Sequence, residues 1–164
     1  MIVLALGSNL GDRETTIRNA LHELDAVDGI DVVAASSIIE TPALKSHGVD
    51  PDAPAYLNAA VEVRTSLDPH ALLTVLNRIE HNHGRVRDER WGDRTLDIDI
   101  IVFDDLALDT RELTIPHPRA AQRAFVLAPW LELDPHASLG ALGSVAGLLA
   151  TMTQPTPYAA EALK

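Results

Sequence analysis

In the stretch from Leu96 to Phe103, apolar and polar residues alternate strictly as far as Ile100. Four aliphatic residues share one parity: Leu96, Ile98, Ile100 and Val102. Asp97 and Asp99 occupy the other parity. A period of two residues is typical of a half-buried β-strand, in which residues i and i+2 share a face. This strand is therefore predicted to project Asp97 and Asp99 side by side, with an aliphatic ridge behind them.

Apolar patterns elsewhere predict further strands and helices. Strands are predicted at Ile2–Leu6, Ile30–Ile39 and Tyr56–Val63, with short extended pieces at Leu106–Leu108 and Leu113–Ile115. Helical spacing predicts helices over Arg13–Val27, Ser66–Gly84 and Arg119–Leu133, the last of them broken by Pro129. Thr41–Ala55 has no periodicity and is expected to be a long loop, of the kind that is usually functional or disordered.

The order of these elements predicts an α+β fold. Two β-α-β units followed by short strands and helices match a ferredoxin-like split βαβ arrangement, with a mainly antiparallel sheet covered by helices. We expect a single domain over residues 1–150 and a C-terminal tail, residues 151–164, that frays. Because this fold hosts many unrelated functions, the site residues must decide the activity.

Composition narrows the class of protein. The 164 residues are 46% hydrophobic, include no cysteine and contain no apolar run long enough for a membrane span. The first residues lack the basic leader of a signal peptide, so we expect a cytoplasmic protein, and we expect it to act as a monomer. A net charge of −11 argues against nucleic-acid or membrane partners, because the long-range field repels both.

An arginine-rich segment directly precedes the aspartate pair. Arg85, Arg87, Arg90 and Arg94 surround Trp91. Neighbouring carboxylates repel each other unless a positive charge lies between them, and Mg²⁺ is commonly held by one or two carboxylates, water and substrate phosphates. Arginine forks clamp phosphates, so the combination favours phosphoryl transfer. An isolated Asp-x-Asp would instead indicate a strand with solvated aspartates.

Other residues allow two interpretations. Tyr56 and Phe125 are core aromatics or the two walls of a site for a flat ring, whose edge Asn58 could read. His117 is a surface or capping residue, or a positioned donor near phosphates. Arg123 is either a solvated helix residue or a phosphate ligand. Glu80 is either a solvated helix residue or a hydrogen-bond partner of a ribose or an arginine.

Taken together, the motifs resemble the 6-hydroxymethyl-7,8-dihydropterin pyrophosphokinase family of folate biosynthesis. The matching pieces, in chain order, are Leu6–Asp12, Glu40–Pro42, Tyr56–Ala59, Gly84–Arg87, Arg90–Gly92, Arg94–Ile100, Pro116–Arg119 and Arg123–Leu127. They cover roughly Ile2 to Leu133 in the right order, which makes the combination specific, although each motif alone is weak. Asp93 departs from the family, which usually has proline there, and so does the long Lys45–Ala55 segment.

The resemblance implies that a pyrophosphoryl group moves from ATP to the pterin's hydroxymethyl oxygen, leaving AMP. It implies two Mg²⁺ ions on Asp97 and Asp99, and a pterin stacked between Tyr56 and Phe125. Its edge would be read by Asn58 and by the backbone of Thr41, Pro42 and Leu44. The phosphate positions are matched by Arg85, Arg94, His117 and Arg123. The remaining expected ATP contacts are Asn77, Glu80, the backbone near Ile100 and Thr114, and the catalytic-loop residues Arg87, Arg90 and Trp91.

We expect the segments Thr41–Ala55 and Arg85–Arg94 to close over both substrates and exclude water, and loop motion to limit turnover. Two alternatives make different predictions. Another metal-dependent phosphoryl or nucleotidyl transferase would keep the aspartates and arginines but would not need Tyr56, Asn58 and Phe125 to converge. An RNA-binding module would show exposed aromatics and a basic surface, whereas this chain is acidic and poor in aromatics.

Overall fold

The computed structural model of the chain describes residues 1–45, 48–50, 53–84 and 95–164. Its strands are β1 Ile2–Ser8, β2 Ile30–Ala35, β3 Ile39–Thr41, β4 Ala43–Lys45, β5 Gly48–Asp50, β6 Tyr56–Thr65, β7 Asp97–Phe103, β8 Leu108–Asp109, β9 Thr114–Ile115 and β10 Thr156–Pro157. Its α-helices are α1 Arg13–Asp25, α2 Pro69–Asn82, α3 Ala124–Leu133 and α4 Val145–Leu149, and its 3₁₀ turns are η1 Ala120–Gln122 and η2 Gly140–Leu142.

An antiparallel sheet forms the centre of the molecule. Within the described residues the strand order is β10-β3-β6-β1-β7, and β2 also pairs with β6. Strand β1 lies between β6 and β7, so that Gly7 faces Asn58 on one side and Asp97 on the other. The mixed helical and antiparallel architecture agrees with the α+β prediction.

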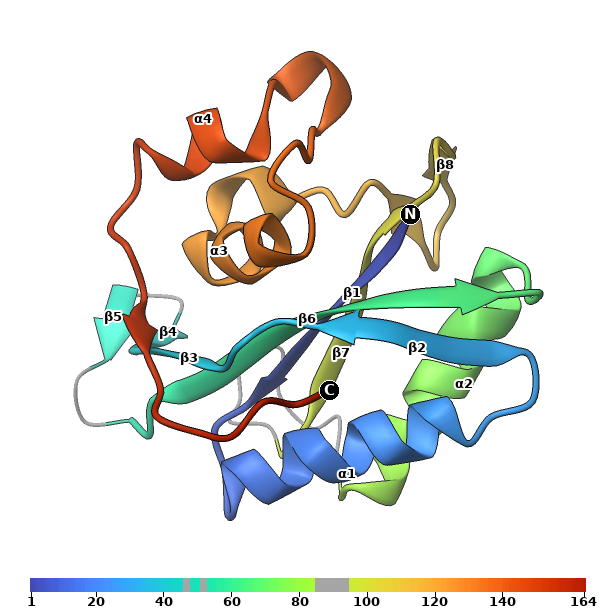
Figure 1. Cartoon of the computed structure of the whole chain (residues 1–164), viewed down its shortest axis with the longest axis horizontal. Coiled ribbons are helices and arrows are strands. Elements are labelled where there is room, and N and C mark those ends of the chain that lie inside the picture. Colours follow the sequence, from blue (N-terminus) through green and yellow to red (C-terminus); the bar gives the residue numbers. More distant parts are fainter. Residues whose placement is uncertain (46–47, 51–52, 85–94) are drawn as a thin grey trace.

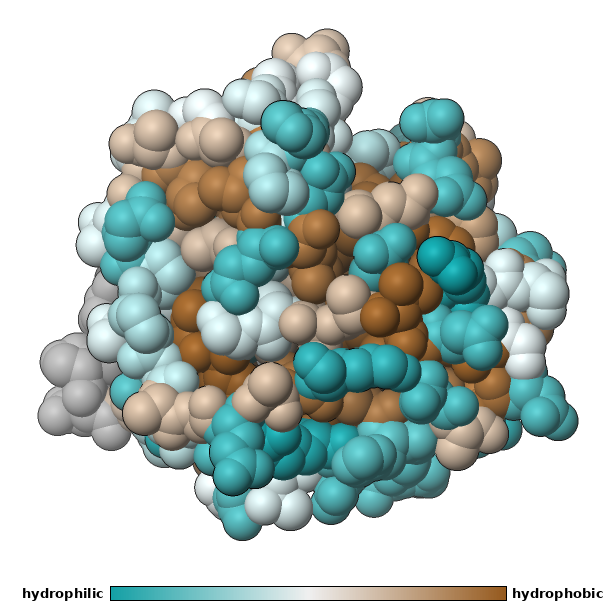
Figure 2. All heavy atoms as spheres, viewed as in Figure 1, coloured by the Kyte–Doolittle hydropathy of each residue, from teal (hydrophilic) through white to brown (hydrophobic). Residues whose placement is uncertain are grey.

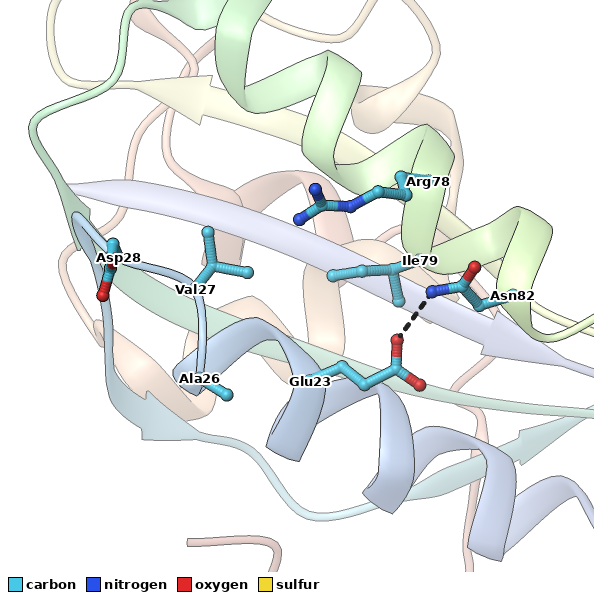
Figure 3. A pocket seen from close by; sticks show the side chains of 7 residues that line it. All are labelled: Glu23, Ala26, Val27, Asp28, Arg78, Ile79 and Asn82. Atoms are coloured by element: carbon cyan, nitrogen blue, oxygen red, sulfur yellow. Dashed lines mark hydrogen bonds between the residues drawn. The ribbon is translucent and has the colours of Figure 1, made fainter.

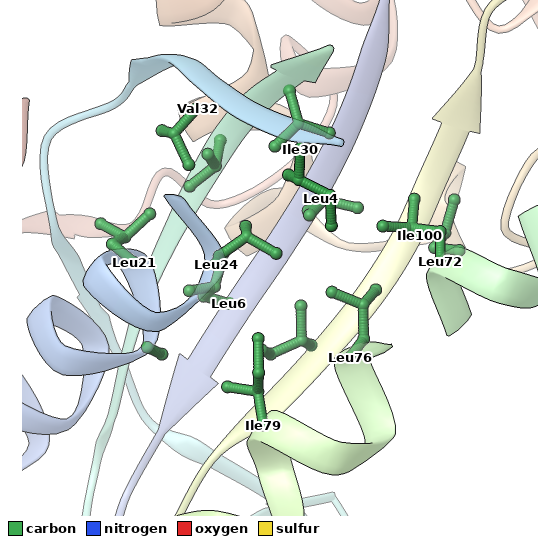
Figure 4. Close-up of a cluster of buried hydrophobic side chains, with 14 of the residues drawn as sticks. Leu4, Leu6, Leu21, Leu24, Ile30, Val32, Leu72, Leu76, Ile79 and Ile100 are labelled. Carbon is green, nitrogen blue, oxygen red and sulfur yellow. The ribbon is translucent and has the colours of Figure 1, made fainter. Parts of the chain in front are cut away.

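Helices cover both faces of this sheet (Figure 1). Helices α1 and α2 pack on one face over a core that includes Leu4, Leu24 and Leu76, shown in Figure 4. Helices α3 and α4 pack on the opposite face over a second core, which includes Val3 and Leu127. Alternation along β1 decides which side chain joins which core. The even-numbered residues of β1 point to the first core, and Val3 points to the second. Figure 2 shows the hydrophilic solvent side of α1 and apolar side chains gathered over α4.

The helix starts follow capping chemistry that the sequence contains. Asp12 caps α1 by accepting the backbone N–H of Thr15, and Asp68 caps α2 by accepting those of His70 and Ala71. Each carboxylate satisfies donors that the first turn of a helix leaves without a partner. Every helix in the described part of the chain is too short or too polar to cross a membrane.

The single strand predicted over Ile30–Ile39 is wrong, because two strands, β2 and β3, follow each other along the same edge of β6. Between them Ser36 donates its backbone N–H to the Ala60 carbonyl at 2.9 Å, and its hydroxyl accepts the Ala60 N–H at 2.9 Å. The hydroxyl thus replaces a backbone carbonyl in the ladder. Ser37 then turns outward, where its N–H and its hydroxyl both donate to Glu132.

Two other local predictions also need correction. The Thr41–Ala55 segment contains a short hairpin, in which β4 pairs with β5. Pro129 does not break the last predicted helix, since it lies inside α3. The break comes earlier, where Arg123 ends η1 with extended backbone at φ −123° and ψ 98° and α3 starts afresh.

The C-terminal tail, predicted to fray, makes defined contacts with the sheet and with α1. Strand β10 pairs with β3 at the sheet edge, and Tyr158 donates its N–H to the Ile38 carbonyl at 3.0 Å. The guanidinium of Arg18 then donates to the carbonyls of Glu161 and Ala162 at 2.7 and 3.1 Å. Pro155 and Pro157 favour an extended chain, which is the conformation that an edge strand requires.

Candidate active site

Small residues on β1 lie between polar side chains of β6 and β7 on the α3 side of the sheet, and we call this arrangement the trough. Gly7 lies in register between Asn58 and Asp97, and Ala5 lies between Ala60 and Asp99. A Cβ atom on Gly7 would approach the Asn58 Oδ1 to 3.2 Å, so glycine leaves the space that Asn58 occupies. An amide on β6 and two carboxylates on β7 thus flank these two residues, the floor of the trough.

The aspartates sit on the strand face that their alternation predicts. Ile98 and Ile100 are buried in the core beneath α1 and α2, which directs Asp97 and Asp99 to the other face. The Asp99 Oδ2 lies 3.6 Å from the Arg123 Nη1 and 3.7 Å from the His117 Nε2. The structure therefore brings together three of the residues predicted to handle phosphate and metal.

His117 is neutral at neutral pH. Burial, reinforced by the positive charges of Arg123 and Arg119, lowers the pKa of its imidazole from 6.5 to about 4. The Nδ1 accepts the backbone N–H of Arg119 at 3.1 Å, so the proton of the neutral ring is on Nε2, the nitrogen nearest Asp99. The contact with Asp99 is consequently no ion pair, and the ring offers one donor toward the trough. Its backbone N–H is fixed by the Ile101 carbonyl of β7 at 2.8 Å.

The start of α3 places an aromatic ring beside the charged groups. The Arg123 guanidinium carbon lies 5.6 Å from the centre of the Phe125 ring, within cation–π range. Helix α3 packs against β6 and β3, the strands that carry the amide side of the trough. Phe125 is half-buried in that layer, so it retains an accessible surface.

On the amide side, Asn58 and Thr41 are joined. The Asn58 Nδ2 donates to the Thr41 Oγ1 at 2.9 Å, and only 5% of Asn58 is exposed. This hydrogen bond to Thr41 fixes the orientation of the Asn58 amide. The Oδ1 of that amide is then the atom that lies nearest to Gly7. Tyr56 is half-buried and pairs with Thr41 in the sheet, whereas Pro42 is exposed.

The remaining expected ATP contacts lie on β7, on β9 and on α2. Strand β9, with Thr114, packs beside β7 and Ile100, and Asn77 is half-buried on α2. Glu80 is not the solvated helix residue that one interpretation of the sequence suggests. It is 2% exposed, and its carboxylate accepts the Ile98 N–H at 2.8 Å. Glu80 therefore ties α2 to β7 between the two aspartates.

Several predicted site residues fall outside the described part of the chain. These are Arg85, Arg87, Arg90, Trp91 and Arg94. Leu44 belongs to β4, and only its backbone is described.

The donor set fits Mg²⁺. Asp97 and Asp99 are hard oxygen ligands on one strand face, and Mg²⁺ commonly takes one or two carboxylates and completes its shell with water and phosphate oxygens. A cluster of three or more His, Asp or Glu side chains suited to a metal is absent from the described residues. A metal on this pair would thus remain open to a phosphate-bearing substrate.

A groove between the ends of α1 and α2 has a volume of about 540 Å³ (Figure 3). It is lined by residues that include Glu23, Arg78 and Asn82 and lies away from the two aspartates. Asn82 donates to Glu23 across it at 3.3 Å. No predicted site residue lines this groove, so the trough on the α3 side is the candidate active site.

The predicted site residues do not include Ala5 and Gly7, which give the trough its shape but carry no reactive group. Ala5 belongs to the strand predicted over Ile2–Leu6, and Gly7 directly follows it. The available signal was the fall in size along one face of β1, from Val3 through Ala5 to Gly7.

Comparisons with known proteins give a consistent result. The 7,8-dihydro-6-hydroxymethylpterin-pyrophosphokinase family matches residues 3–135 of this chain. A 2-amino-4-hydroxy-6-hydroxymethyldihydropteridine pyrophosphokinase of Bacillus subtilis is 45% identical over 130 residues, covering 79% of this chain and 75% of the relative. One of the same name from Methylorubrum extorquens is 42% identical over 137 residues, covering 84% of each chain.

Solved structures share the fold. A Plasmodium falciparum HPPK-DHPS triple mutant with SDX-DHP aligns with a TM-score of 0.69 at 18% identity, covering 92% of this chain. This chain spans 44% of that longer protein. At this identity the likeness concerns the fold alone.

Proposed function

The chain belongs to the 7,8-dihydro-6-hydroxymethylpterin-pyrophosphokinase family, and we propose that the trough on the α3 side of its sheet is where it carries out the family's reaction. The protein is a diphosphotransferase of folate synthesis, which transfers pyrophosphate from ATP to the hydroxymethyl group of 6-hydroxymethyl-7,8-dihydropterin and releases AMP. The observation that supports this location is the placement of Asn58 and the pair Asp97 and Asp99 on opposite flanks of a floor made of Ala5 and Gly7.

The amide side of the trough is proposed to bind the pterin. A flat, polar heterocycle needs apolar faces above and below and hydrogen-bonding groups at its edge. Tyr56 on β6 and Phe125 on α3 supply the aromatic faces, and Asn58, oriented by Thr41, supplies the edge contact. The backbone of Pro42 and Leu44 would contribute further edge contacts.

The carboxylate side is proposed to bind the ATP phosphates. Asp97 and Asp99 would hold two Mg²⁺ ions, which when bound neutralise phosphate charge and orient phosphate oxygens. Arg123 and the neutral His117 point donors at the same region, as their distances to Asp99 show. The proposed ligands also include Arg85, Arg87, Arg90, Trp91 and Arg94, with Asn77, Ile100 and Thr114 on the nucleotide side. Glu80 is proposed to support β7 from within the core, because its carboxylate is buried and accepts the Ile98 N–H.

This arrangement explains how the substrates react. The pterin's hydroxymethyl oxygen attacks the β-phosphorus of ATP and gives up its proton to solvent, and the bond from that phosphorus to the oxygen shared with the α-phosphate breaks, releasing AMP. Opposite flanks of one rigid sheet hold the two substrates, which lowers the entropic cost of in-line approach. Arg123 and His117 donate to oxygens that gain charge during transfer.

The connectivity of the sheet supports a split βαβ fold. With β2 and β3 taken as one edge strand, the order is that edge strand, β6, β1 and β7, and α1 and α2 are the crossovers on one face. We propose this arrangement for the family domain, with residues 136–164 as an addition that packs on it. All the proposed site residues belong to one chain, so a monomer is proposed to suffice.

The test is AMP formation from MgATP and 6-hydroxymethyl-7,8-dihydropterin. Asp97→Asn and Asp99→Asn should each lower kcat on the order of 10³-fold, since each removes a charge that acts in the transition state. Asp104→Asn is the matched control, because Asp104 follows the same strand but pairs with the N-terminus at 2.7 Å. Full AMP formation in both Asp97 and Asp99 variants would rule out the proposed site.

A further inference from the structure

One guanidinium joins the two ends of the segment between β3 and β6. The Arg13 Nη1 donates to the Glu40 Oε1 at 2.9 Å and to the Ala55 carbonyl at 2.7 Å. Glu40 lies just before the segment of residues 41–55, and Ala55 closes it. Nearby, the Asn9 Nδ2 donates to the Pro54 carbonyl at 3.3 Å.

The position of Arg13 is fixed by the start of α1. Arg13 is the first residue of that helix, immediately after the N-cap Asp12, whose carbonyl accepts the Thr16 N–H at 2.9 Å. Only 24% of the Arg13 side chain is exposed, so its bond to Glu40 is partly shielded from solvent. Charge-assisted bonds in such surroundings are stronger than those on an open surface.

Each group that Arg13 holds is next to a residue proposed to contact the pterin. Glu40 precedes Thr41, the partner of Asn58, and Ala55 precedes Tyr56. Thr41 and Tyr56 face each other in the sheet, where β3 leaves β6. Arg13 thus keeps together the two chain ends that form the mouth of the pterin side.

We propose that Arg13, through Glu40 and Ala55, is a positioning residue for the pterin pocket. It does not contact the pterin itself; it keeps Thr41, Asn58 and Tyr56 in the arrangement that the ring requires before binding. The inference rests on the proposed function of the trough. In the described part of the chain the Arg13 Nη1 bonds go to Glu40 and Ala55, whereas the ATP side lies on β7 and on residues 114–123, so the nucleotide affinity is expected to be independent of Arg13.

Binding measurements on the full chain test this role. Calorimetry would give the Kd of 6-hydroxymethyl-7,8-dihydropterin in the presence of a non-hydrolysable ATP analogue and Mg²⁺, and separately the Kd of that analogue. Arg13→Gln and Glu40→Gln should each weaken pterin binding roughly 10-fold and leave the nucleotide Kd unchanged. The double variant should be little worse than Arg13→Gln, because that substitution already removes the Arg13–Glu40 interaction. Arg13→Lys should recover part of the affinity.

Arg18→Gln is the matched control. Arg18 also lies on α1 and pairs with a carboxylate, Glu14, at 2.9 Å, but its backbone partners are the carbonyls of Glu161 and Ala162. This variant should bind pterin as the unmodified chain does. An equal loss of both affinities in Arg13→Gln, or no loss of pterin affinity, would overturn the proposal.

Hydrogen exchange without substrates separates this proposal from the proposed function. Arg13→Gln should speed amide exchange in residues 39–41 and 55–57 relative to Arg18→Gln, whatever the trough binds. Failure of the unmodified chain to bind pterin would refute the function, whereas unchanged exchange would refute the role of Arg13.

Discussion

At the scale of single residues, the absent side chain of Gly7 leaves room for Asn58. The backbone of Gly7 has the conformation of an ordinary strand, so alanine can replace it without strain in the backbone dihedral angles. Its Cβ would nevertheless lie 3.2 Å from the Asn58 Oδ1 and 3.8 Å from the Tyr56 Cδ1, which forces Asn58 to shift by a few tenths of an ångström. Gly7→Ala should therefore raise KM for the pterin by roughly 10-fold, the effect of one misplaced hydrogen bond.

Steady-state kinetics with each substrate varied in turn would check this expectation. KM for ATP should stay unchanged, because Gly7 is between the two flanks but its Cβ would meet only the β6 side. Ala5→Gly, which removes a side chain from the same face of β1, is the control and should leave the pterin KM near its original value. Equal pterin KM values for Gly7→Ala and the unmodified chain would contradict the assignment of Asn58.

His117 gives the folded protein a sensitivity to acid. Its folded pKa of about 4 lies below the 6.5 expected in the unfolded chain. Between these pH values the unfolded chain binds more protons, so the contribution of His117 is fully present above pH 6.5 and is lost as pH falls toward 4. His117→Gln in metal-free buffer should therefore lose less unfolding free energy than the unmodified chain across this range.

Urea unfolding at several pH values would measure the difference between the two chains. Carboxylates titrate in both, so only the difference in slope reports on the imidazole. His136→Gln is the comparison at another histidine, an exposed one. Parallel pH profiles for the His117 variant and the unmodified chain would show that the imidazole is not held neutral.

At the scale of elements, the C-terminal strand supports an edge of the sheet next to the site. Ending the chain after Gln154 removes β10, which pairs with β3, together with Tyr158 and Leu163, which pack on the main core. The loss of two partly buried side chains should lower the free energy of unfolding by about 2 kcal/mol. Thermal and urea unfolding would measure the effect.

Lys164→Ala is the control for the truncation, because it removes only the charge at the chain end and leaves strand β10 in place. Lys164 pairs with Asp25 at 3.3 Å, and both side chains are largely exposed. Exposed ion pairs contribute little, so this variant should unfold like the unmodified chain. If it unfolded like the truncated chain, the pairing of β10 would carry no stability.

Elements with a regular pattern could be predicted from the sequence, and those decided by one long-range contact could not. The alternation in β7 and the helical spacing in α1 and α2 reflect burial of a whole face, which no single neighbour can change. The break between β2 and β3 depends on the hydroxyl of Ser36 replacing a carbonyl opposite Ala60. That contact joins residues 24 positions apart and leaves no periodic trace.

The same distinction applies to the site. The shared strand face of Asp97 and Asp99 could be predicted from their alternation, whereas Asn58 and Phe125 were named through a combination of motifs, each of which alone is weak. The buried place of Glu80 was not legible, because an acidic residue on a helix normally faces solvent. Only the fold shows that β7 offers it the N–H of Ile98.

At the scale of the whole molecule, the two hydrophobic cores should unfold as one unit. They lie on opposite faces of one sheet and are built on the same central strands, since β1 contributes Leu4 to one core and Val3 to the other. Leu4→Ala and Leu127→Ala each empty a site that is fully buried. Each should lower the free energy of unfolding by about 2–5 kcal/mol and shift one common transition.

Calorimetry decides between shared and separate unfolding, because a single cooperative unit has equal calorimetric and van't Hoff enthalpies. A split transition in Leu127→Ala, with the α3 side melting first, would contradict the prediction. The two variants should still differ in activity. Leu127 packs beneath α3, the helix that carries Phe125, whereas Leu4 points to the opposite face. Below the transition, Leu127→Ala should therefore raise KM for the pterin more than Leu4→Ala does, which ties the α3 core to the site it supports.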